Sequence, residues 1–431
     1  MTLFHEFALK EPPQHRGWNA PLRIRVALAG FTIYLLLIGA NLATPLYPYL
    51  REQMHLTSAA TSLAFVAYVI ALIVGLLCAS HWSEHMGRRA VLVASVLVGL
   101  AGAVVFTFAT GLTGLVVGRL LQGAAVALAT GASAAAVREL LPESPDAATR
   151  ITLLSSSGGV ASGPLLGGWL STLGHPVLVP FVLHIVTLVA VIVPLVLLKA
   201  RPASQRPVGP RRVRALMPLR PTPPREAKRI FFLCSLTGFL SFATFGFFLS
   251  FAPAFYSPLL GSSRIMTGVL AALVLGSAAV AQLVTLRPRH RGAGGLALMA
   301  AGLALVAALG HESRLALLAG GVLTGLGQGT AFRTLFTYMS ASVPRSRHAT
   351  TISLMYVITY LGSAVPILLL GAAIDRFGIV AAVTVFLAGL VAMAAVLAVW
   401  TRFEPEPPQY VEVRVSEADV DHKMGEEPPH L

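Results

Sequence analysis

Three basic side chains stand inside long apolar stretches, namely Arg119, His184 and Arg333. A charged side chain is costly in apolar surroundings, so each arginine should meet a carbonyl oxygen, a water-filled cavity or an anion. One expectation is therefore a cavity with an excess of positive charge. The alternative is that Arg119 and Arg333 extend toward the nearer end of their stretch. Because an imidazole ordinarily titrates near neutral pH, His184 is a candidate proton carrier, or else a packed, hydrogen-bonded residue.

Carboxylates show the opposite distribution. The ten acidic residues that precede the C-terminal tail all lie in predicted loops or at predicted helix ends. Proton-coupled carriers commonly place a carboxylate within the membrane, where burial tunes its pKa. The absence of such a group argues against ordinary exchange of a cation for a proton.

Motifs of enzymes are missing. The sequence has no His-Glu-x-x-His helix, no Gly-x-Ser-x-Gly elbow, no paired aspartates in an apolar stretch and no phosphate-binding Gly-x-x-x-x-Gly-Lys-Ser/Thr loop. We therefore expect no catalytic residues, no metal, no cofactor and no ATP drive, and the proton gradient is the expected energy source.

Composition places the chain in a membrane. Of 431 residues, 55% are hydrophobic and 12% are charged, and the mean hydropathy is +0.76, whereas soluble domains carry roughly 25% charged residues. The net charge of +14 does not indicate nucleic-acid binding, because the basic residues cluster in short loops between apolar runs. Cys78 and Cys234 lie in apolar runs, so no disulfide framework is expected.

Apolar runs of the length that crosses a bilayer, about 20 residues, recur along the chain. The sequence predicts an all-α membrane protein with twelve such helices, at residues 26–48, 59–80, 90–109, 112–137, 151–173, 177–199, 229–253, 266–286, 294–310, 315–341, 350–373 and 378–401. Lysine and arginine concentrate in alternate loops, which predicts that this side and both termini are cytoplasmic. The N-terminal segment has no clear cleavage site, so we expect it to be retained in a bacterial cytoplasmic (inner) membrane protein.

Segments outside the spans differ in charge. Residues 199–229 hold ten basic residues and seven prolines, which predicts a linker lying against anionic lipid headgroups. The tail holds eight of the eighteen acidic residues and is expected to be disordered. The predicted units are a cytoplasmic segment 1–25, a six-helix bundle 26–199, a linker 200–228, a second bundle 229–401 and a tail 402–431.

The two halves resemble each other weakly. Prolines end the first and seventh spans, Gln-Gly recurs in the fourth and tenth, and a proline follows glycine in the fifth and eleventh. The matched pairs, 208, 206 and 202 residues apart, are Pro45 with Pro253, Gln122 with Gln328, and Pro164 with Pro366. This agreement in order and spacing favours two pseudo-symmetric bundles with a site between them.

The fifth span carries five glycines and a proline between Gly158 and Trp169. Gly159, Gly163 and Gly167 recur every four residues and therefore share one helix face, and Pro164 is expected to bend the segment. Small residues let membrane helices approach closely. We expect this face to pack against a helix of the other bundle.

The loop after the second predicted span, residues 80–92, reads Ser-His-Trp-Ser-Glu-His-Met-Gly-Arg-Arg-Ala-Val-Leu. It resembles the loop signature G-x-L-A-D-R-x-G-R-R-x-x-L of the major facilitator superfamily, with Ser80 and His85 as departures. Glu84 holds the acidic place, and Gly87, Arg88 and Arg89 match. The resemblance implies a gating loop that latches the two bundles on the cytoplasmic side. Arg138 is the expected basic partner of Glu84; an ordinary positively charged loop is the alternative.

Two further patterns extend the resemblance. Arg119-x-x-Gln122-Gly123 is similar to the family's fourth-helix motif. The glycine-rich fifth span is similar to the antiporter motif of the twelve-span drug:proton antiporter branch, and it matches at residues Gly159, Gly163, Pro164, Gly167 and Gly168. The resemblance implies a secondary transporter that works by alternating access.

Residues that could line the cavity are aromatic or polar. Phe239, Phe242 and Phe245 are spaced to share a face of the seventh span, and Tyr34, Asn41, Gln328, Tyr356 and Tyr360 could supply hydrogen bonds. Packing contacts between helices are the alternative role. With Arg333, these are the candidate cavity residues for a small amphipathic substrate, neutral or anionic.

The sequence therefore predicts a secondary exporter of small amphipathic molecules, expected to be a monomer and to be driven by proton influx. A carrier of metabolites, sugars or siderophores on the same fold, without proton antiport, is the alternative. A non-transporting sensor would leave the repeat of the two halves unexplained.

Overall fold

The fold is given by a computed structural model of the 431-residue chain. The structure describes residues 6–7, 17–79, 82–199, 227–261, 263–283, 291–343 and 348–403. Nearly all of the basic linker and of the acidic tail lies outside these residues, so the predictions made for them are not addressed.

The described chain is helical, and its long helices agree one for one with the twelve predicted spans. The first six are α2 (Leu22–Asn41), α4 (Ser58–Ala79), α6 (Arg88–Thr107), α7 (Leu112–Leu140), α8 (Pro145–Leu170) and α9 (Leu178–Leu197). The second six are α10 (Lys228–Ser250), α13 (Arg264–Leu283), α14 (Arg291–Leu309), α15 (Arg314–Ser342), α16 (His348–Phe377) and α17 (Ile379–Arg402). Short helices fill some of the connections, namely η1 (Thr44–Leu46), α3 (Tyr47–Gln53), α5 (Trp82–Met86), α11 (Ala252–Phe255) and α12 (Ser257–Leu260).

Local sequence explains several helix boundaries. Pro21 precedes α2, and Pro145 opens α8, where the missing N–H costs nothing. Gly87 has a φ of +97° immediately before α6, and Gly378 has a φ of +83° between α16 and α17. Other residues rarely adopt this backbone conformation, so these glycines permit the sharp turns between adjacent helices.

Eleven of the helices in the described residues are long and apolar enough to cross a membrane. The one remaining long helix among the described residues, α8, has 26 residues but is rich in glycine and serine, which lowers its hydropathy. It packs between α2 and α13 and runs unbroken through Pro164. The predicted all-α membrane fold is confirmed, with eleven candidate spans among the described residues and α8 at the place of the fifth predicted span.

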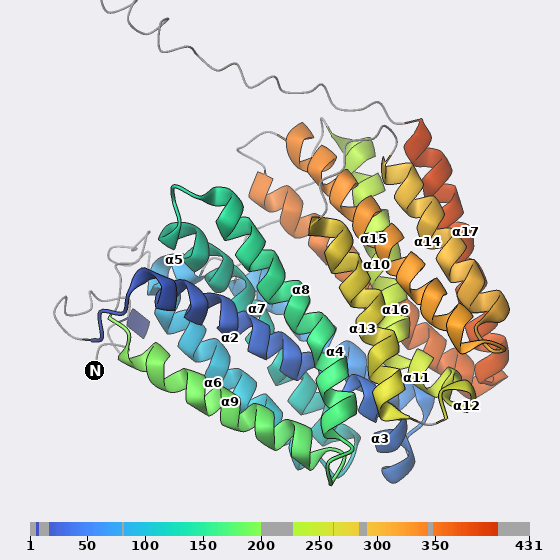
Figure 1. The fold of residues 1–431 in the computed structure, drawn as a ribbon, viewed down its shortest axis with the longest axis horizontal. Helices are drawn as coiled ribbons and strands as arrows, with labels where there is room; N and C mark the ends of the chain where they lie inside the picture. The colour runs from blue at the N-terminus through green and yellow to red at the C-terminus, as the bar shows by residue number, and fades with distance from the viewer. Residues whose placement is uncertain are drawn as a thin grey trace, which may run out of the picture.

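The helices form two bundles with the same internal pairing. In the first, α2 packs on α8, α4 on α7, and α6 on both α7 and α9. In the second, the equivalent pairs are α10 with α16, α13 with α15, and α14 with both α15 and α17. The recurrence of every pair at the corresponding place supports the duplication that the sequence indicates. Figure 1 shows the first bundle in blue to green and the second in yellow-green to red.

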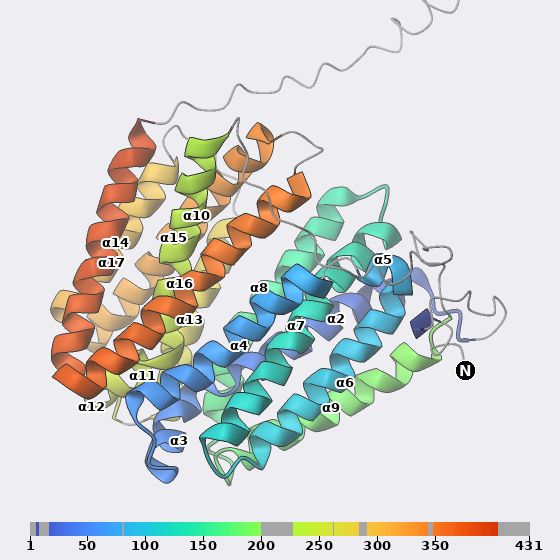
Figure 2. The same ribbon diagram turned by 180° about the vertical axis from the view of Figure 1, so that it is seen from behind.

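The bundles touch mainly through two helix pairs, α8 with α13 and α4 with α16. Near the end of α8, the Arg264 guanidinium donates to the carbonyl oxygen of Ser171 at 3.0 Å. From this end, which carries α3, α11 and α12, the ribbons of the two bundles diverge in both views (Figures 1 and 2). We call it the closed end, and the opposite end, which carries α5, the open end.

One expectation about α8 is wrong. Gly159, Gly163 and Gly167 face α2 of their own bundle: a Cβ at Gly163 would lie 2.6 Å from the Cβ of Asn41, and one at Gly167 would overlap the Leu42 carbonyl. The contact with the other bundle is made by Gly168, the residue after Gly167. A Cβ at Gly168 would overlap the carbonyl oxygen of Arg264. A rotation of about 100° per residue separates these two faces, and spacing alone does not say which bundle each meets.

Candidate functional site

The buried arginine of α7 lies at the centre of the first bundle. The Arg119 side chain is 2% exposed and donates to the carbonyl oxygen of Ala40 on α2 and to Oε1 of Gln122, the latter at 2.9 Å. Its guanidinium carbon is 4.7 Å from the centre of the Tyr68 ring on α4, a cation–π arrangement. Arg119 therefore does not extend to the end of its helix. It joins three helices through a carbonyl, an amide and an aromatic face.

Two donors in this cluster are left unused. Nε of Arg119 and Nε2 of Gln122 are buried and have no hydrogen-bond partner among the residues that the structure describes. An unsatisfied buried donor costs free energy, which an acceptor group on a bound molecule would recover. Gly123 completes the motif. A Cβ added at this position would overlap the carbonyl oxygen of Tyr68, so α4 and α7 can approach this closely only because Gly123 has no side chain. The motif thus positions Tyr68 over Arg119.

Aromatic side chains of the second bundle form a continuous array. Phe242 of α10 meets Tyr360 edge-on with ring centres 4.8 Å apart, and Tyr360 stacks on Tyr356 at 6.1 Å. Phe245 lies 6.0 Å from Phe242. Phe239, Phe242 and Phe245 are all partly exposed, whereas the residues between them on α10 are buried, which is consistent with the single face that their spacing predicts.

This array borders a pocket between the bundles. The pocket holds about 360 Å³ of empty space and is lined by Ile73, Leu76 and Leu77 of α4 and by residues of α16 that include Tyr356 and Tyr360. Its walls are largely apolar, with aromatic rings on one side. A pocket of this kind suits small molecules with a flat or apolar part.

The remaining polar candidates differ in their hydrogen bonds. The Tyr34 hydroxyl donates to Ser162 Oγ at 3.1 Å, joining α2 to α8, and Asn41 donates to the Leu37 carbonyl of its own helix at 2.8 Å. Gln328 is buried, and its Oε1 has no hydrogen-bond partner within the described residues.

Arg333 occupies a different setting from Arg119. Its guanidinium donates to the carbonyl oxygen of Gln282 at the end of α13. A cation near a helix C-terminus is favourable because the exposed carbonyls carry partial negative charge. Arg333 thus meets a carbonyl oxygen, which is one of the partners that we expect for an arginine within a span.

His184 lies inside the first bundle. It is buried, and its ring fills the space beside Gly39 that a Cβ would otherwise occupy. Gly39 precedes Ala40, whose carbonyl accepts from Arg119. His184 and Arg119 thus contact adjacent residues of α2, although neither the sequence nor the spacing of these residues indicated that they would be neighbours.

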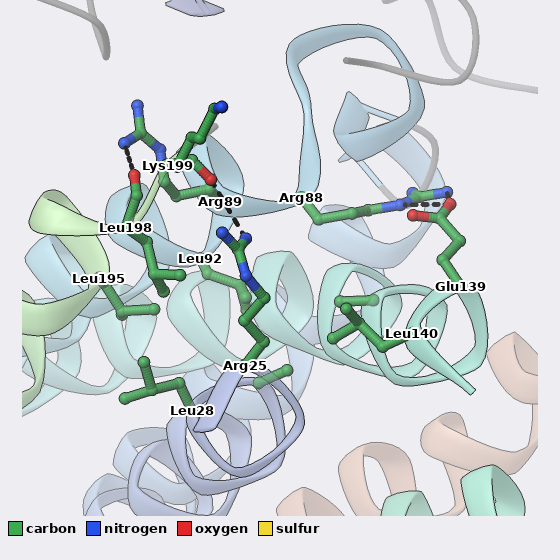
Figure 3. Close-up of a pocket in the computed structure, with 12 residues that line it drawn as sticks. Arg25, Leu28, Arg88, Arg89, Leu92, Glu139, Leu140, Leu195, Leu198 and Lys199 are labelled. Carbon is green, nitrogen blue, oxygen red and sulfur yellow. Dashed lines mark hydrogen bonds and ion pairs between the residues drawn. The ribbon is translucent and has the colours of Figure 1, made fainter. Parts of the chain in front are cut away.

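The loop after the second span does not form the expected ion pair. Within the described residues, Glu84 and Arg138 make no ion pair with each other; instead, Arg88 pairs with Glu139 at 2.7 Å and also donates to Ser83 Oγ. Figure 3 shows the side chains of Arg88 and Glu139 extending toward each other. The predicted pair took its acid from the loop and its base from α7, whereas the observed pair takes its acid from α7. Glu139 follows Arg138 by one residue, and the helix rotation of about 100° per residue directs the Glu139 side chain toward α6. This contact lies within the first bundle and does not latch the two bundles.

Arg89 is also paired. Its guanidinium forms a buried ion pair with Glu6 of the N-terminal segment, with Nη2 and Oε2 2.6 Å apart, and donates to the carbonyl oxygen of Leu198. Among the described residues there is no cluster of three or more metal-ligating side chains.

Sequence reasoning missed three residues of functional interest. Tyr68 stacks on Arg119, Glu6 neutralises Arg89, and Asp375 connects the bundles at the closed end. Tyr68 had a signal, since it is a lone polar-tipped residue at the middle of an apolar helix. Asp375 precedes a glycine that ends α16, but its partner is 317 residues away, and no local pattern indicates that contact.

Two pseudo-symmetric six-helix bundles with a pocket between them define a class, the secondary transporters that work within a lipid bilayer. The sequence matches the Major Facilitator Superfamily over residues 28–291 and 288–420, and the chain belongs to that family. It is a transporter of small molecules and not an enzyme.

Individual relatives are distant. A uridine/deoxyuridine transporter of Lactococcus lactis is 27% identical over 161 residues, which are 37% of this chain and 34% of that protein, so the chain matches about a third of this relative's length. A bacterial homologue of the human lysosomal transporter Spinster, in an inward-facing and occupied conformation, has a similar fold, with a TM-score of 0.70 and 16% identity over 89% of this chain and 97% of that one. A point mutant of the nucleoside transporter NupG is similar with a TM-score of 0.67 and 12% identity over 89% of this chain and 100% of that one. At these identities the solved structures show the fold alone.

Proposed function

We propose that the protein carries small neutral or anionic metabolites with a planar or aromatic part across the cytoplasmic membrane by alternating access. The observation that carries this proposal is the aromatic array of Phe242, Tyr360 and Tyr356 beside the inter-bundle pocket. Rings of this kind stack on flat molecules and provide little that would select a particular polar group.

Charge also favours this proposal. The described spans contain a buried arginine with an unused donor, whereas their carboxylates lie at or near helix ends, as with Glu139 and Asp375. Arg119 does not line the inter-bundle pocket, but Tyr68, whose ring lies over its guanidinium, belongs to α4, which does line it. A positive charge near the pocket favours hydrogen-bond acceptors and anions over cations. Nucleosides belong to the class of small polar-aromatic molecules, and the uridine/deoxyuridine transporter of Lactococcus lactis makes them a reasonable first group to test.

The test is uptake by purified protein in proteoliposomes. We expect radiolabelled uridine or a planar aromatic carboxylate to accumulate and a lipophilic cation of similar size to be excluded. Empty vesicles give the background. Transport of the cation alone would refute the proposal.

Export of amphipathic molecules in exchange for protons is the second candidate. The pattern Gly159, Gly163, Pro164, Gly167 and Gly168 in α8 supports it, since this pattern resembles that of drug:proton antiporters. For proton coupling we propose His184, which lies beside the helix that Arg119 contacts. Cells that overproduce the protein would then survive toxic amphipathic compounds better, and a protonophore would remove that protection.

A further inference from the structure

Tyr68 of α4 connects the buried arginine of the first bundle to the surface where the two bundles meet. Its ring lies against the Arg119 guanidinium, whose carbon is 4.7 Å from the ring centre. Unlike Arg119, Tyr68 is partly exposed, and its hydroxyl makes no hydrogen bond within the described residues. A tyrosine hydroxyl in apolar surroundings usually has a hydrogen-bond partner. The Tyr68 hydroxyl is therefore available to a group on a bound molecule.

Tyr68 lies beside the inter-bundle pocket, on its closed-end side. At the closed end, α4 and α16 pack so tightly that a Cβ at Gly371 would overlap Ser62 Oγ, and the pocket wall on α4 begins at Ile73. Tyr68 lies between these two points and is five residues from Ile73, which is about 7.5 Å along the helix axis. The hydroxyl groups of Tyr68 and Tyr360 interact electrostatically across the interface, and Tyr360 lines the pocket. A molecule that extends past Tyr360 therefore meets the Tyr68 hydroxyl.

The arginine changes what this hydroxyl can recognise. A cation on the face of an aromatic ring draws electron density toward itself, so the O–H becomes a stronger donor and its oxygen a weaker acceptor. Arg119 is 2% exposed and does not line the pocket, so it does not contact a molecule bound there. Its charge reaches the pocket through Tyr68 and favours oxygen acceptors over donors.

The acceptor that fits this pocket is uncharged. Apart from Ser353, the described residues that line it are aliphatic or aromatic, and none of them is charged. An anion held there would lose its hydration and gain only neutral donors, which costs free energy. A carbonyl oxygen on a planar ring loses less hydration, and one hydrogen bond from a polarised hydroxyl replaces it.

We propose that Tyr68 determines substrate specificity: its hydroxyl donates to a carbonyl oxygen on an uncharged planar ring that lies against Tyr360. Arg119 is a positioning residue that holds and polarises Tyr68 without touching the substrate. The role of Tyr68 rests on the proposed function and narrows its substrates from neutral or anionic molecules to neutral rings that carry a carbonyl group. The pyrimidine ring of a nucleoside is a molecule of this class.

Equilibrium binding of tritiated uridine to the purified full-length protein tests this proposal, with competition by 2-thiouridine and 4-thiouridine. Each analogue replaces one carbonyl oxygen with sulfur, a weaker acceptor. The unchanged protein should prefer uridine to one of the analogues by about fivefold, the effect of one neutral hydrogen bond. Tyr68→Phe should remove this preference at an unchanged melting temperature, since it deletes a hydroxyl without a hydrogen bond among the described residues. Tyr49→Phe is the matched control, because the Arg264 guanidinium carbon lies 5.4 Å from its ring centre, but at the closed end.

Arg119→Gln separates polarisation from packing. It should reduce the preference for oxygen over sulfur when Tyr68 is present and should leave it unchanged in a Tyr68→Phe background. An arginine with a purely structural role would weaken the binding of all three nucleosides equally.

The outcomes separate this proposal from the proposed function. Equal affinity of the unchanged protein for the three nucleosides, an unchanged preference in Tyr68→Phe, or an equal loss in Tyr49→Phe would overturn the role of Tyr68. Binding of a planar aromatic carboxylate without binding of uridine would also overturn it, and the proposed function would stand in each of these cases. If proteoliposomes take up neither uridine nor the carboxylate, the proposed function fails, and the role of Tyr68 fails with it.

Discussion

The Asp375 carboxylate near the end of α16 accepts a hydrogen bond from the backbone N–H of Ser58, the first residue of α4, at 2.8 Å. Its second oxygen accepts from the N–H of Ala59, also at 2.8 Å. An acid of one bundle thus caps a helix of the other. A carboxylate at a helix N-terminus satisfies donors that have no partner within the helix and is attracted to its partial positive charge.

This contact predicts a conformational effect. Asp375→Asn should reduce the closed-end population by roughly fivefold, because the favourable charge is lost while the shape is kept. Single-molecule energy transfer between labels on α4 and α16 measures the population. Glu312→Gln is the control, since Glu312 lies at the same end of the second bundle and forms no ion pair within the described residues. Equal effects of the two variants would show that the cap does not hold the bundles.

The two glycine faces of α8 predict different defects. Gly163→Leu should destabilise the first bundle by about 1–3 kcal/mol, because the side chain would collide with Asn41 on α2. Gly168→Leu should leave the melting temperature of the bundle nearly unchanged and impair closure against Arg264. Thermal unfolding and transport are measured on both variants. Normal transport by Gly168→Leu would contradict the role of this contact.

Arg119 and Arg333 should differ in their contribution to transport. Arg119→Ala is expected to lower transport of neutral and anionic substrates by about a hundredfold, since a charge-assisted hydrogen bond is worth about 1.5–3 kcal/mol and this arginine donates to both Ala40 and Gln122. Arg119→Lys should recover little, because one ammonium group does not reproduce the guanidinium over Tyr68. Arg333→Ala should retain most transport, because that side chain contacts a helix terminus. Vesicle uptake measures all three variants, and equal losses in the two alanine variants would contradict this distinction.

The aromatic array predicts an effect on affinity. Tyr360→Ala should raise the KM for an aromatic substrate by about threefold to tenfold, from an aromatic contact worth about 0.5–1.5 kcal/mol. Tyr360→Phe keeps the ring and should restore affinity. Phe108→Ala, at a residue that is 68% exposed after α6, is the matched control outside the pocket. An unchanged KM for Tyr360→Ala would remove this residue from the substrate site.

Proton coupling rests on one histidine in our proposal. His184→Gln should preserve the fold, because glutamine fills a similar space beside Gly39. If His184 carries the proton, transport by this variant loses its dependence on an imposed pH gradient while exchange without a gradient continues. A pH dependence equal to that of the unchanged protein would assign His184 to packing alone.

The sequence by itself was sufficient for the spans, for their duplication and for the family. These features are encoded locally: about 20 apolar residues make a helix that crosses a bilayer wherever it lies, and Arg119-x-x-Gln122 places both side chains on one helix face. The site candidates Phe242 and Phe245 followed from the same periodicity, and their rings lie 6.0 Å apart.

Only the tertiary structure decided which faces meet. A shift of one residue turns a helical side chain by about 100°, which is why Arg88 pairs with Glu139 and not Glu84 with Arg138, and why Gly168 and not Gly163 meets the other bundle. The partners of Asp375 and Arg89 lie 317 and 83 residues away along the chain. Such contacts depend on the relative rotation and approach of packed helices, and no local pattern of residue types specifies these quantities.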